Sequence, residues 1–374
     1  MTPQAIAQQW SFTALDTLFF RESRPMDAIG GAQLQSVFPP PARTLIGAIR
    51  TAVGQAHDVD WNAYASDKNA PLRAIIGSPE SLGPLSFAGP FLLKGNERLF
   101  PVPLALLHAS APEKAGVKFT RLVPSEVATT SDLGKLRLPK KRDALAGAKP
   151  MENASITAAG LQAFLNGGMP DADTIFSNDA LYDSEERLGI GRDNGKRTTQ
   201  DGLLYQTNHV RPKHDVTIGI VVKGLVMDKL PETGTARLGA EGRMASWQRE
   251  AAEPLPAAKL NGERIMLLLL THARFEHGWL PDGFEKKTID KDVTVWDGEI
   301  QGVKLRLISA VVGKPLREGG WDLVNGMPRT MDSLVPAGSC YFFEKIGGDA
   351  GKLNGLQIGL DTDHGRGEIA IGTW

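Results

Sequence analysis

The sequence predicts an α+β protein that is rich in β-sheet and divided into two domains. Its 374 residues exceed what one hydrophobic core usually fills. Glycine (41 residues) and proline (24 residues) are abundant, which indicates many turns and loops between short strands. Hydrophobic residues at 41% and charged residues at 23% are typical of a folded, globular chain.

The opening segment is expected to form a strand and then a helix. Residues 10–13 alternate and lead into the apolar residues 18–20. Pro39, Pro40 and Pro41 suit a first helical turn, because the N–H that proline lacks would have had no partner there. The predicted helix has one apolar face, whose residues recur at three- and four-residue spacing: Leu45, Ile46, Ile49, Ala52 and Val53. Gly54 is expected to cap its C-terminus.

Later elements follow from the same periodicities. A short helix is predicted over 157–164, and strands over 84–93, 99–103, 216–222, 303–312, 340–343 and 368–371. The apolar run 266–270 is either a buried strand or a buried helical turn, and periodicity leaves both open. Periodicity is lost from 108 to 150. We therefore expect domains at 1–212, with an insertion at about 108–182, and at 213–374.

Composition excludes several classes of protein. Lys plus Arg (42) nearly cancels Asp plus Glu (43), so only local clusters can indicate a polyanionic partner. The N-terminus carries no export signal, and the longest apolar run, 265–270, is far short of the ~20 residues that a membrane helix needs. Cys340 is the single cysteine, which excludes an internal disulfide. We expect a cytoplasmic protein without a membrane partner.

Motifs for cofactors and metals fail on context. Gly365-Arg366-Gly367 cannot be a dinucleotide loop, because only seven residues follow it and they read as a strand. The segment 272–277 has one residue too many for a His-x-x-Glu-His site, and 361–364 reads as an acidic turn. We expect no cofactor, no metal and no covalent nucleophile.

One pattern remains, in which arginine stands beside glycine. There a backbone can approach closely while a guanidinium binds phosphate oxygens. The pattern recurs at 186–189, 191–192, 239–243 and 365–367, and residues 135–142 form the densest basic run. A single instance is better explained by a solvated turn. Together they favour RNA or another polyanion. Arg21, Arg24 and Arg50, in the opening strand–helix segment, are either surface charge or part of an anion site.

The same stretches, in order, resemble the third-named Cmr subunit of type III-B CRISPR effector complexes, a family within the RAMP superfamily. The match begins with Asp-Thr-Leu-Phe-Phe-Arg at 16–21 and continues through 38–50, 186–193, 202–205, 238–243, 319–322, 336–339 and 372–374. Ala240 stands where glycine is usual, and Arg366 stands where an apolar residue is common. The segment 108–150 carries no family motif.

This resemblance implies two ferredoxin-like (RNA-recognition-like) modules with long loop insertions and a glycine-rich C-terminal tail. It implies a non-catalytic role: gripping the 5′ repeat-derived tag of the guide RNA, and anchoring the large polymerase-like subunit beside the first backbone subunit. In related capping subunits a hairpin "thumb" wedges between the tag and the guide. Such a tag is single-stranded, so its bases can stack while arginines and backbone N–H groups hold its phosphates.

We expect RNA contacts at three groups of residues. The phosphate contacts are Arg21, Arg24, Arg50, Arg187, Arg192, Arg243 and Arg366. Close approach of the RNA backbone is expected at Gly189, Gly242, Gly365 and Gly367. The remaining contacts are Lys140, Lys141, Arg142 and His364. For Arg50, a helix-end arginine that interacts with the helix dipole is an equal alternative.

Two other functions stay open. A metal-independent RAMP endoribonuclease would process precursor guide RNA with a general acid and base, and His57, His209, His214 and His364 are available for those roles. None of these histidines belongs to a recognisable catalytic arrangement. The other alternative is a protein-assembly adaptor that makes no RNA contact.

Overall fold

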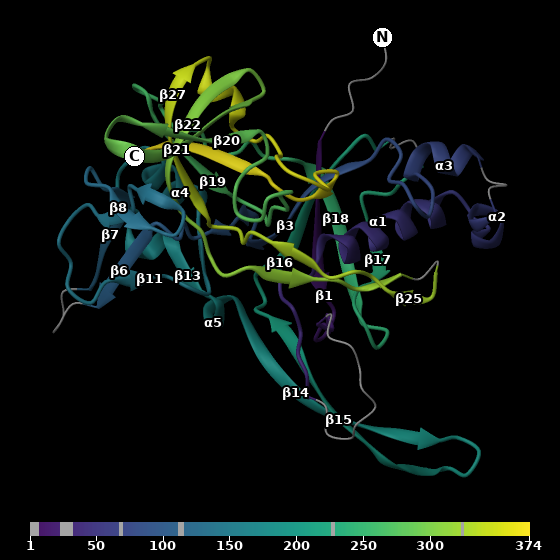
Figure 1. Ribbon diagram of the computed structural model, residues 1–374. Coiled ribbons are helices and arrows are strands. Elements are labelled where there is room, and N and C mark those ends of the chain that lie inside the picture. The colour runs from purple at the N-terminus through teal and green to yellow at the C-terminus, as the bar shows by residue number, and fades with distance from the viewer. Residues whose placement is uncertain (1–6, 23–32, 67–69, 111–115, 226–228, 323–324) are drawn as a thin grey trace. The chain divides into compact units, whose positions relative to one another are not determined.

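The computed structural model describes residues 7–22, 33–66, 70–110, 116–225, 229–322 and 325–374, and strands predominate in it (Figure 1). The chain forms two compact units that interleave along the sequence. Unit 1 comprises Met1–Asn96, Asp179–Glu253 and Arg317–Asp332, and unit 2 comprises Glu97–Asn178, Pro254–Leu316 and Ser333–Trp374. The predicted sheet-rich α+β class is confirmed. That either unit is a ferredoxin-like module stays a prediction.

The expected boundary at 212/213 does not coincide with a boundary between these units. Strand β1 (Gln8–Ala14) pairs antiparallel with β16 (Val216–Lys223), and Trp10 lies opposite Ile220. The two strands flank that expected boundary and belong to one sheet. Local periodicity detects each strand but not its partner, because strand pairing over 200 residues leaves no mark in a short window.

Unit 1 contains an antiparallel sheet in the order β17-β18-β1-β16-β3. Its other strands are β3 (Ser86–Lys94), β17 (Thr233–Arg237) and β18 (Met244–Ala251). The first strand is buried on both faces, since Gln9 and Ser11 are enclosed as well as Trp10 and Phe12. The indole of Trp10 lies 4.6 Å from that of Trp247, measured between ring centroids.

Three helices accompany this sheet: α1 (Ala42–Ala56), α2 (Trp61–Ala65) and α3 (Ala70–Ile76). The predicted helix and its apolar face are confirmed, but the expected cap at Gly54 is wrong because α1 continues to Ala56. Gly54 instead leaves room for the ring of Trp61, which would lie 2.7 Å from an added Cβ. In the described part of the chain, no helix combines the length and the apolar character that a membrane span needs.

A long two-stranded ribbon extends from unit 1 (Figure 1). It consists of β14 (Tyr182–Asp193) and β15 (Thr198–Pro212), with the short β2 (Gln33–Leu34) parallel to β15 near its base. The turn at its tip is stabilised by Asp193, whose carboxylate accepts hydrogen bonds from the N–H groups of Gly195 and Lys196. Unit 1 also contains the small pair β24 (Trp321–Asp322) and β25 (Met327–Pro328).

Unit 2 is built on the sheet β29-β19-β27-β22-β21-β9-β8, with β20 on β21. The strands are β8 (Thr129–Ser131), β9 (Gly134–Leu136), β19 (Arg264–Leu269), β20 (Phe284–Ile289), β21 (Val293–Ile300), β22 (Val303–Val311), β27 (Cys340–Gly347) and β29 (Ile369–Thr373).

Smaller sheets surround it, in the orders β10-β7-β6-β11 and β13-β12-β5. Their strands are β5 (Phe100–Pro101), β6 (Leu106–Ser110), β7 (Val117–Pro124), β10 (Pro139–Lys141), β11 (Lys149–Pro150), β12 (Ala154–Ile156) and β13 (Ile175–Ser177). The remaining elements are β4 (Glu97–Arg98), α4 (Ala158–Leu165), η1 (Ala172–Thr174), α5 (Asn178–Leu181), η2 (Asp290–Asp292), β23 (Leu316–Glu318), β26 (Asp332–Leu334), η3 (Ala350–Leu353) and β28 (His364–Gly365).

The apolar run near residue 268 is a central strand, which settles the choice that periodicity left open. Strand β19 is covered on both faces, as a continuous apolar run requires. Its alternate side chains enter two different cores: Ile265, Leu267 and Leu269 pack with Phe343, and Met266, Leu268 and Leu270 pack with Phe164 of α4. The segment from 108 to 150, expected as an insertion without periodicity, supplies several short strands to this unit.

The glycine-rich tail of unit 2 is an internal turn. Gly365 and Gly367 are buried and have positive φ angles of 87° and 72°. The side chain of Arg366 between them is also buried, with Nη1 3.3 Å from Oδ2 of Asp361. An exposed phosphate-binding turn was expected here. The structure instead shows a packing turn, in which Gly367 is required because the chain passes close to the carbonyl of Ile358.

Replacing Gly367 with alanine should therefore destabilise the protein strongly. An added Cβ would lie 1.9 Å from the Ile358 carbonyl oxygen on a backbone with positive φ. We expect a loss of ~3 kcal/mol or more in the free energy of unfolding, measured by urea denaturation. Gly302→Ala is the matched control, because φ is +81° there but no described atom lies within 4 Å of the added Cβ. It should cost only about 1 kcal/mol. Equal losses would contradict the packing explanation.

Candidate nucleic-acid interface

Three arginines of unit 1 converge on the carboxylate of Asp16. Arg187 Nη2 lies 3.3 Å from Oδ2, Arg211 Nη2 lies 3.0 Å from Oδ1, and Arg243 Nη1 lies 3.1 Å from Oδ2. Glu185 Oε2 also accepts a hydrogen bond of 2.7 Å from Arg211. We call Asp16, Glu185, Arg187, Arg211 and Arg243 the arginine cluster.

The cluster forms where separate segments meet at the base of the ribbon. Asp16 follows the end of β1, Arg187 lies on β14 and Arg211 lies on β15. In the antiparallel register, Glu185 is opposite His209 and Arg187 is opposite Thr207. Residues two apart on a strand share a face, so Glu185, Arg187 and the partners opposite them all point to the same side. That side faces the segment after β1.

Arg243 reaches the cluster from the loop between β17 and β18. This loop closes with hydrogen bonds from Leu238 N to Arg243 O (2.8 Å) and from Ala240 N to the carbonyl of Phe19 (2.8 Å). Glu241 and Gly242 both adopt positive φ angles within it. No described atom lies within 4 Å of the position that a Cβ on Gly242 would take. Of the predicted glycines, Gly242 therefore leaves open space beside the arginines.

The charges of the cluster lower carboxylate pKa values. Hydrogen bonds from Arg211 and then Arg187 lower the pKa of Glu185. Partial burial acts to raise the pKa of Asp16, but the backbone N–H of Thr17 and the two guanidiniums outweigh it, and the net shift is downward. Both carboxylates are consequently ionised at neutral pH. They hold the guanidiniums in fixed directions while leaving further N–H donors on each fork.

His209 lies beneath the cluster and is fully buried, at 0% exposure. Its Nδ1 is 3.0 Å from Thr17 Oγ1, its Nε2 is 3.2 Å from Glu241 Oε2, and its ring stacks on Phe19 at a centroid distance of 5.0 Å. Burial lowers the pKa of His209, and the charge of Arg243 lowers it further against the opposing effect of Glu241. The imidazole is thus a neutral part of the packing.

The ribbon carries a different chemistry on its opposite face. Leu188 and Ile190 alternate with the charged residues of β14, and Leu204 of β15 is opposite Ile190. These three side chains are 74%, 58% and 53% exposed. Gly189, on the charged face, does not leave open space, because the ring of Tyr205 would lie 2.2 Å from an added Cβ. The ribbon thus presents an exposed apolar row behind a charged base.

The other residues predicted in unit 1 lie outside the cluster. Arg21 is exposed and forms an antiparallel bridge to Ser36, and Arg192 is exposed near the tip of the ribbon. Arg24 lies outside the described residues. The guanidinium of Arg50 donates to the hydroxyl of Tyr64 and to a backbone carbonyl at Ser78. Arg50 lies more than one turn before Ala56, the end of α1, so the helix-end alternative is wrong.

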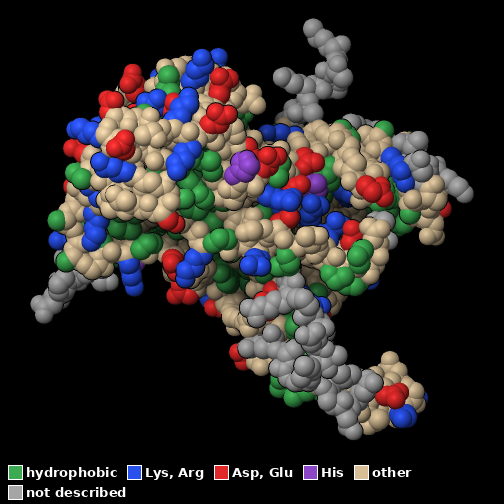
Figure 2. Space-filling model, in the orientation of Figure 1, with side chains coloured by type: hydrophobic (Ala, Val, Ile, Leu, Met, Phe, Trp, Pro, Cys, Tyr) green, Lys and Arg blue, Asp and Glu red, His purple; other side chains and the backbone are tan. Residues whose placement is uncertain are grey.

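Basic residues of unit 2 gather in a separate hollow. Lys140 and Arg142 line a cavity together with Arg121, whereas Lys141 donates to the carbonyl of Leu145. His364 Nδ1 lies 2.7 Å from Asp363 Oδ1 at the tail turn. On the face shown in Figure 2, basic and acidic side chains are interspersed over much of the visible surface, in keeping with the near-neutral total charge.

Sequence reasoning missed Arg211 and Glu185 as members of the site. The dipeptide Asn194-Gly195 indicates a hairpin, but a two-residue turn there would pair Arg211 with Asn178. The observed pairing of Arg211 with Asp183 comes from a longer turn and a register shift between Ile190 and Arg192, which the sequence does not mark. Asp16 had been noted only as part of a family motif, and the clustering of three guanidiniums around it required the tertiary structure.

Comparisons with known proteins agree with the resemblance in the sequence. Residues 10–374 match the sequence model of a family described as "CRISPR-associated protein (Cas_Cmr3)". None of the curated protein sequences matches the chain significantly.

Solved structures similar to the chain share little sequence identity with it. A chain of a type III-B Cmr-beta complex bound to cognate target RNA and AMPPnP has 14% identity and a TM-score of 0.47, with 89% of this chain and 86% of that chain covered. A chain of a second Cmr-beta structure bound to cognate target RNA has 16% identity and a TM-score of 0.45, with 89% of this chain and 86% of that chain covered. A chain of a Csm3–Csm4 subcomplex of a type III-A interference complex has 10% identity and a TM-score of 0.39, with 91% of this chain and 94% of that chain covered.

The burial of His209 predicts that stability depends on pH. Its pKa in the folded protein lies below the ordinary value of 6.5, so its contribution is complete above pH 6.5 and is lost as the pH falls toward the folded pKa. The free energy of unfolding of His209→Gln should depend less on pH between 7.5 and 5.5, by up to about 1.4 kcal/mol per pH unit. Urea denaturation at several pH values measures this. His214→Gln, at an exposed position, should leave the slope unchanged. If the unfolding free energy of His209→Gln depended on pH as strongly as that of the unsubstituted protein, the burial of His209 would not be the cause of the pH dependence.

Proposed function

The chain belongs to the Cmr3 family of CRISPR-associated proteins, and we propose on that basis that it is a non-catalytic RNA-binding subunit of a type III-B effector complex. In this proposal it grips the 5′ repeat-derived tag of the guide RNA. It also anchors the large polymerase-like subunit beside the first backbone subunit, a role that rests on family membership alone. The RNA-binding surface is the base of the β14–β15 ribbon.

The observation that carries the RNA-binding role is the convergence of Arg187 and Arg243 on one carboxylate. The sequence assigned these two arginines to RNA phosphates from separate motifs, and Arg211 joins them at Asp16. Their side chains are partly accessible to solvent. Each guanidinium has five N–H donors, so an ion pair with Asp16 leaves donors free for a phosphate. Gly242 gives the RNA backbone room beside them.

The apolar face of the ribbon supports a second part of the proposal. A single-stranded tag offers unstacked bases, and apolar side chains can insert between neighbouring bases and separate them. Leu188, Ile190 and Leu204 form such a row, with Arg192 farther toward the tip. We therefore assign the thumb of the capping subunits to β14–β15: the charged base holds phosphates, and the apolar row separates the tag from the guide.

The environment of His209 supports a non-catalytic role over an endoribonuclease that uses this histidine. A general acid or base must come within hydrogen-bonding distance of the reacting atoms. His209 is enclosed beneath the arginine cluster, where Thr17 and Glu241 approach its ring nitrogens. We propose that it positions Glu241 and does not transfer protons to RNA.

Substitutions in the arginine cluster should change RNA affinity in opposite directions. Arg187→Ala and Arg243→Ala should each weaken binding of a single-stranded tag RNA roughly tenfold, because each removes a charge-assisted phosphate contact. Each should also reduce the slope of log K against log salt by about 0.7. Asp16→Asn removes a competing carboxylate and should strengthen binding. Fluorescence anisotropy with labelled RNA at several salt concentrations measures both quantities.

Arg237→Ala is the matched control, since Arg237 is an exposed arginine of unit 1 outside the cluster. It should leave affinity nearly unchanged. If Arg187→Ala, Arg243→Ala and Arg237→Ala weakened RNA binding equally, the effect would come from the net charge of the protein and not from the arginine cluster. Labelled repeat RNA incubated with the protein in EDTA and run on a denaturing gel tests the alternative function, because cleavage at one position would exclude the non-catalytic role.

The apolar row should be required for separating nucleobases, but not for RNA affinity at the arginine cluster. Leu188→Ser with Ile190→Ser should suppress the rise in fluorescence of 2-aminopurine placed at the junction of tag and guide, since a polar ribbon separates stacked bases less well. Val127→Ser is the control, because Val127 has the same 74% exposure as Leu188 but lies in unit 2. An undiminished rise in the double variant would rule out the thumb assignment.

A further inference from the structure

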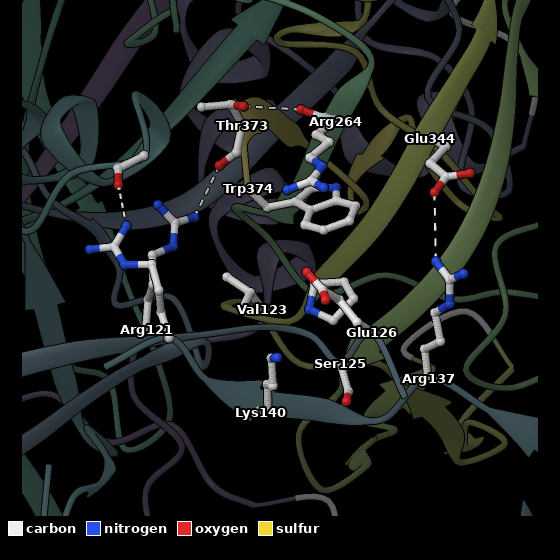
Figure 3. Close-up of a pocket in the computed structure, with 13 residues that line it drawn as sticks. Arg121, Val123, Ser125, Glu126, Arg137, Lys140, Arg264, Glu344, Thr373 and Trp374 are labelled. Atoms are coloured by element: carbon white, nitrogen blue, oxygen red, sulfur yellow. Dashed lines mark hydrogen bonds and ion pairs between the residues drawn. The ribbon is translucent and has the colours of Figure 1, made fainter. Parts of the chain in front are cut away.

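Unit 2 contains a hollow that is separate from the arginine cluster. Its volume is about 510 Å³, within the range of roughly 300–1,000 Å³ that is typical of sites for small organic ligands. Strands β7 and β10 supply one side, and the ends of β19 and β29 supply another (Figure 3). We call it the unit 2 pocket.

Positive charge dominates the lining of this pocket. Five basic side chains line it and only two acidic ones, Glu126 and Glu344. The basic residues are Arg121, Arg137, Lys140, Arg142 and Arg264. Arg137 and Arg142 have carboxylate partners, Glu344 at 3.8 Å and Asp143 at 3.2 Å. Lys140 forms no ion pair among the described residues, and Figure 3 shows its side chain extending from β10 toward Val123 with no dashed line to a neighbour.

Arg121 is the least compensated of these charges. It is 1% exposed, and its partners are the backbone carbonyls of Phe164 (3.2 Å) and Thr373 (3.0 Å). Its Nε is buried without a hydrogen-bond partner, and within the described residues it has no carboxylate. Burial lowers the pKa of Arg121 to about 10, so the group is still charged at neutral pH. A buried charge without a counter-ion is costly, and an anion in the pocket would offset that cost.

The pocket also has an aromatic wall. Trp374 lines it, and the guanidinium of Arg264 lies over the indole, 4.9 Å from the ring centroid (Figure 3). The indole N–H donates to the carbonyl of Phe343 at 3.0 Å, which fixes the orientation of the ring. Nucleobases stack on aromatic rings and on arginine planes of this kind.

We propose that the unit 2 pocket binds a nucleoside monophosphate. Arg121, Lys140 and Arg142 surround its phosphate, and the base lies against Trp374. The ligand is a free nucleotide or the terminal nucleotide of an RNA, since both carry the same phosphate and base. This narrows the predicted RNA contacts of Lys140 and Arg142 to a single nucleotide. The proposal does not depend on the arginine cluster of unit 1. The RNA contacts proposed for that cluster would stand even if the unit 2 pocket bound no ligand.

The test is equilibrium binding to the full chain of four probes: AMP, adenosine, inorganic phosphate and 5′-phosphorylated hexa-adenylate. AMP should bind at least tenfold more tightly than adenosine or inorganic phosphate, because only AMP uses both the basic wall and the aromatic wall. Lys140→Glu should weaken AMP binding at least tenfold. Lys140 is exposed and unpaired among the described residues, so this change should not disturb folding. Lys118→Glu, at an exposed position on β7 outside the pocket, should leave AMP binding unchanged.

Each outcome decides the proposal. AMP binding that Lys140→Glu abolishes supports a site for a free nucleotide. Binding of the phosphorylated hexa-adenylate alone, with the same sensitivity, supports the end of an RNA as the source. If no probe binds, if inorganic phosphate binds as tightly as AMP, or if Lys118→Glu weakens binding as much as Lys140→Glu, the proposal is overturned. Arg187→Ala should leave AMP binding intact, which separates this pocket from the RNA interface of unit 1.

Discussion

The carboxylate of Asp16 is the constraint on which the interface of unit 1 depends. It accepts from three guanidiniums that come from β14, β15 and the β17–β18 loop. Each arginine alone would be a mobile surface side chain with little effect on stability. Gathered around one acceptor, and supported by Glu185, they join the base of the ribbon to the end of β1. The enclosed His209 and Phe19 beneath them complete the junction.

Patterns within a short window were predictable from the sequence, and partners far apart were not. Alternation predicted β16, and spacing predicted α1, because both report burial within one element. Gly54 was misassigned because its role is set by Trp61 of the next helix. Arg187 and Arg243 were found through glycine-arginine motifs. Arg366 carried the same motif but is buried in unit 2, since local sequence does not distinguish a solvated turn from a packed one.

The two basic sites differ in how their charge is compensated. In the arginine cluster, carboxylates already accompany the guanidiniums, so an RNA phosphate bound as proposed would have to compete with Asp16 and Glu185. Such a site favours selective, exchangeable contacts over raw affinity. In the unit 2 pocket, Arg121 donates only to uncharged acceptors among the described residues. An anion that enters there meets the buried guanidinium of Arg121, and electrostatic attraction is stronger for a buried charge than for an exposed one.

The ribbon also acts as a mechanical lever. The part of β14 from Arg187 to Asp193 spans about 20 Å at the usual rise per residue. Arg187 is held at Asp16, so a rotation of about 10° there would displace the tip of the strand by about 3.5 Å. The geometry of a few ion pairs at the base therefore determines where the distant end of the ribbon can reach.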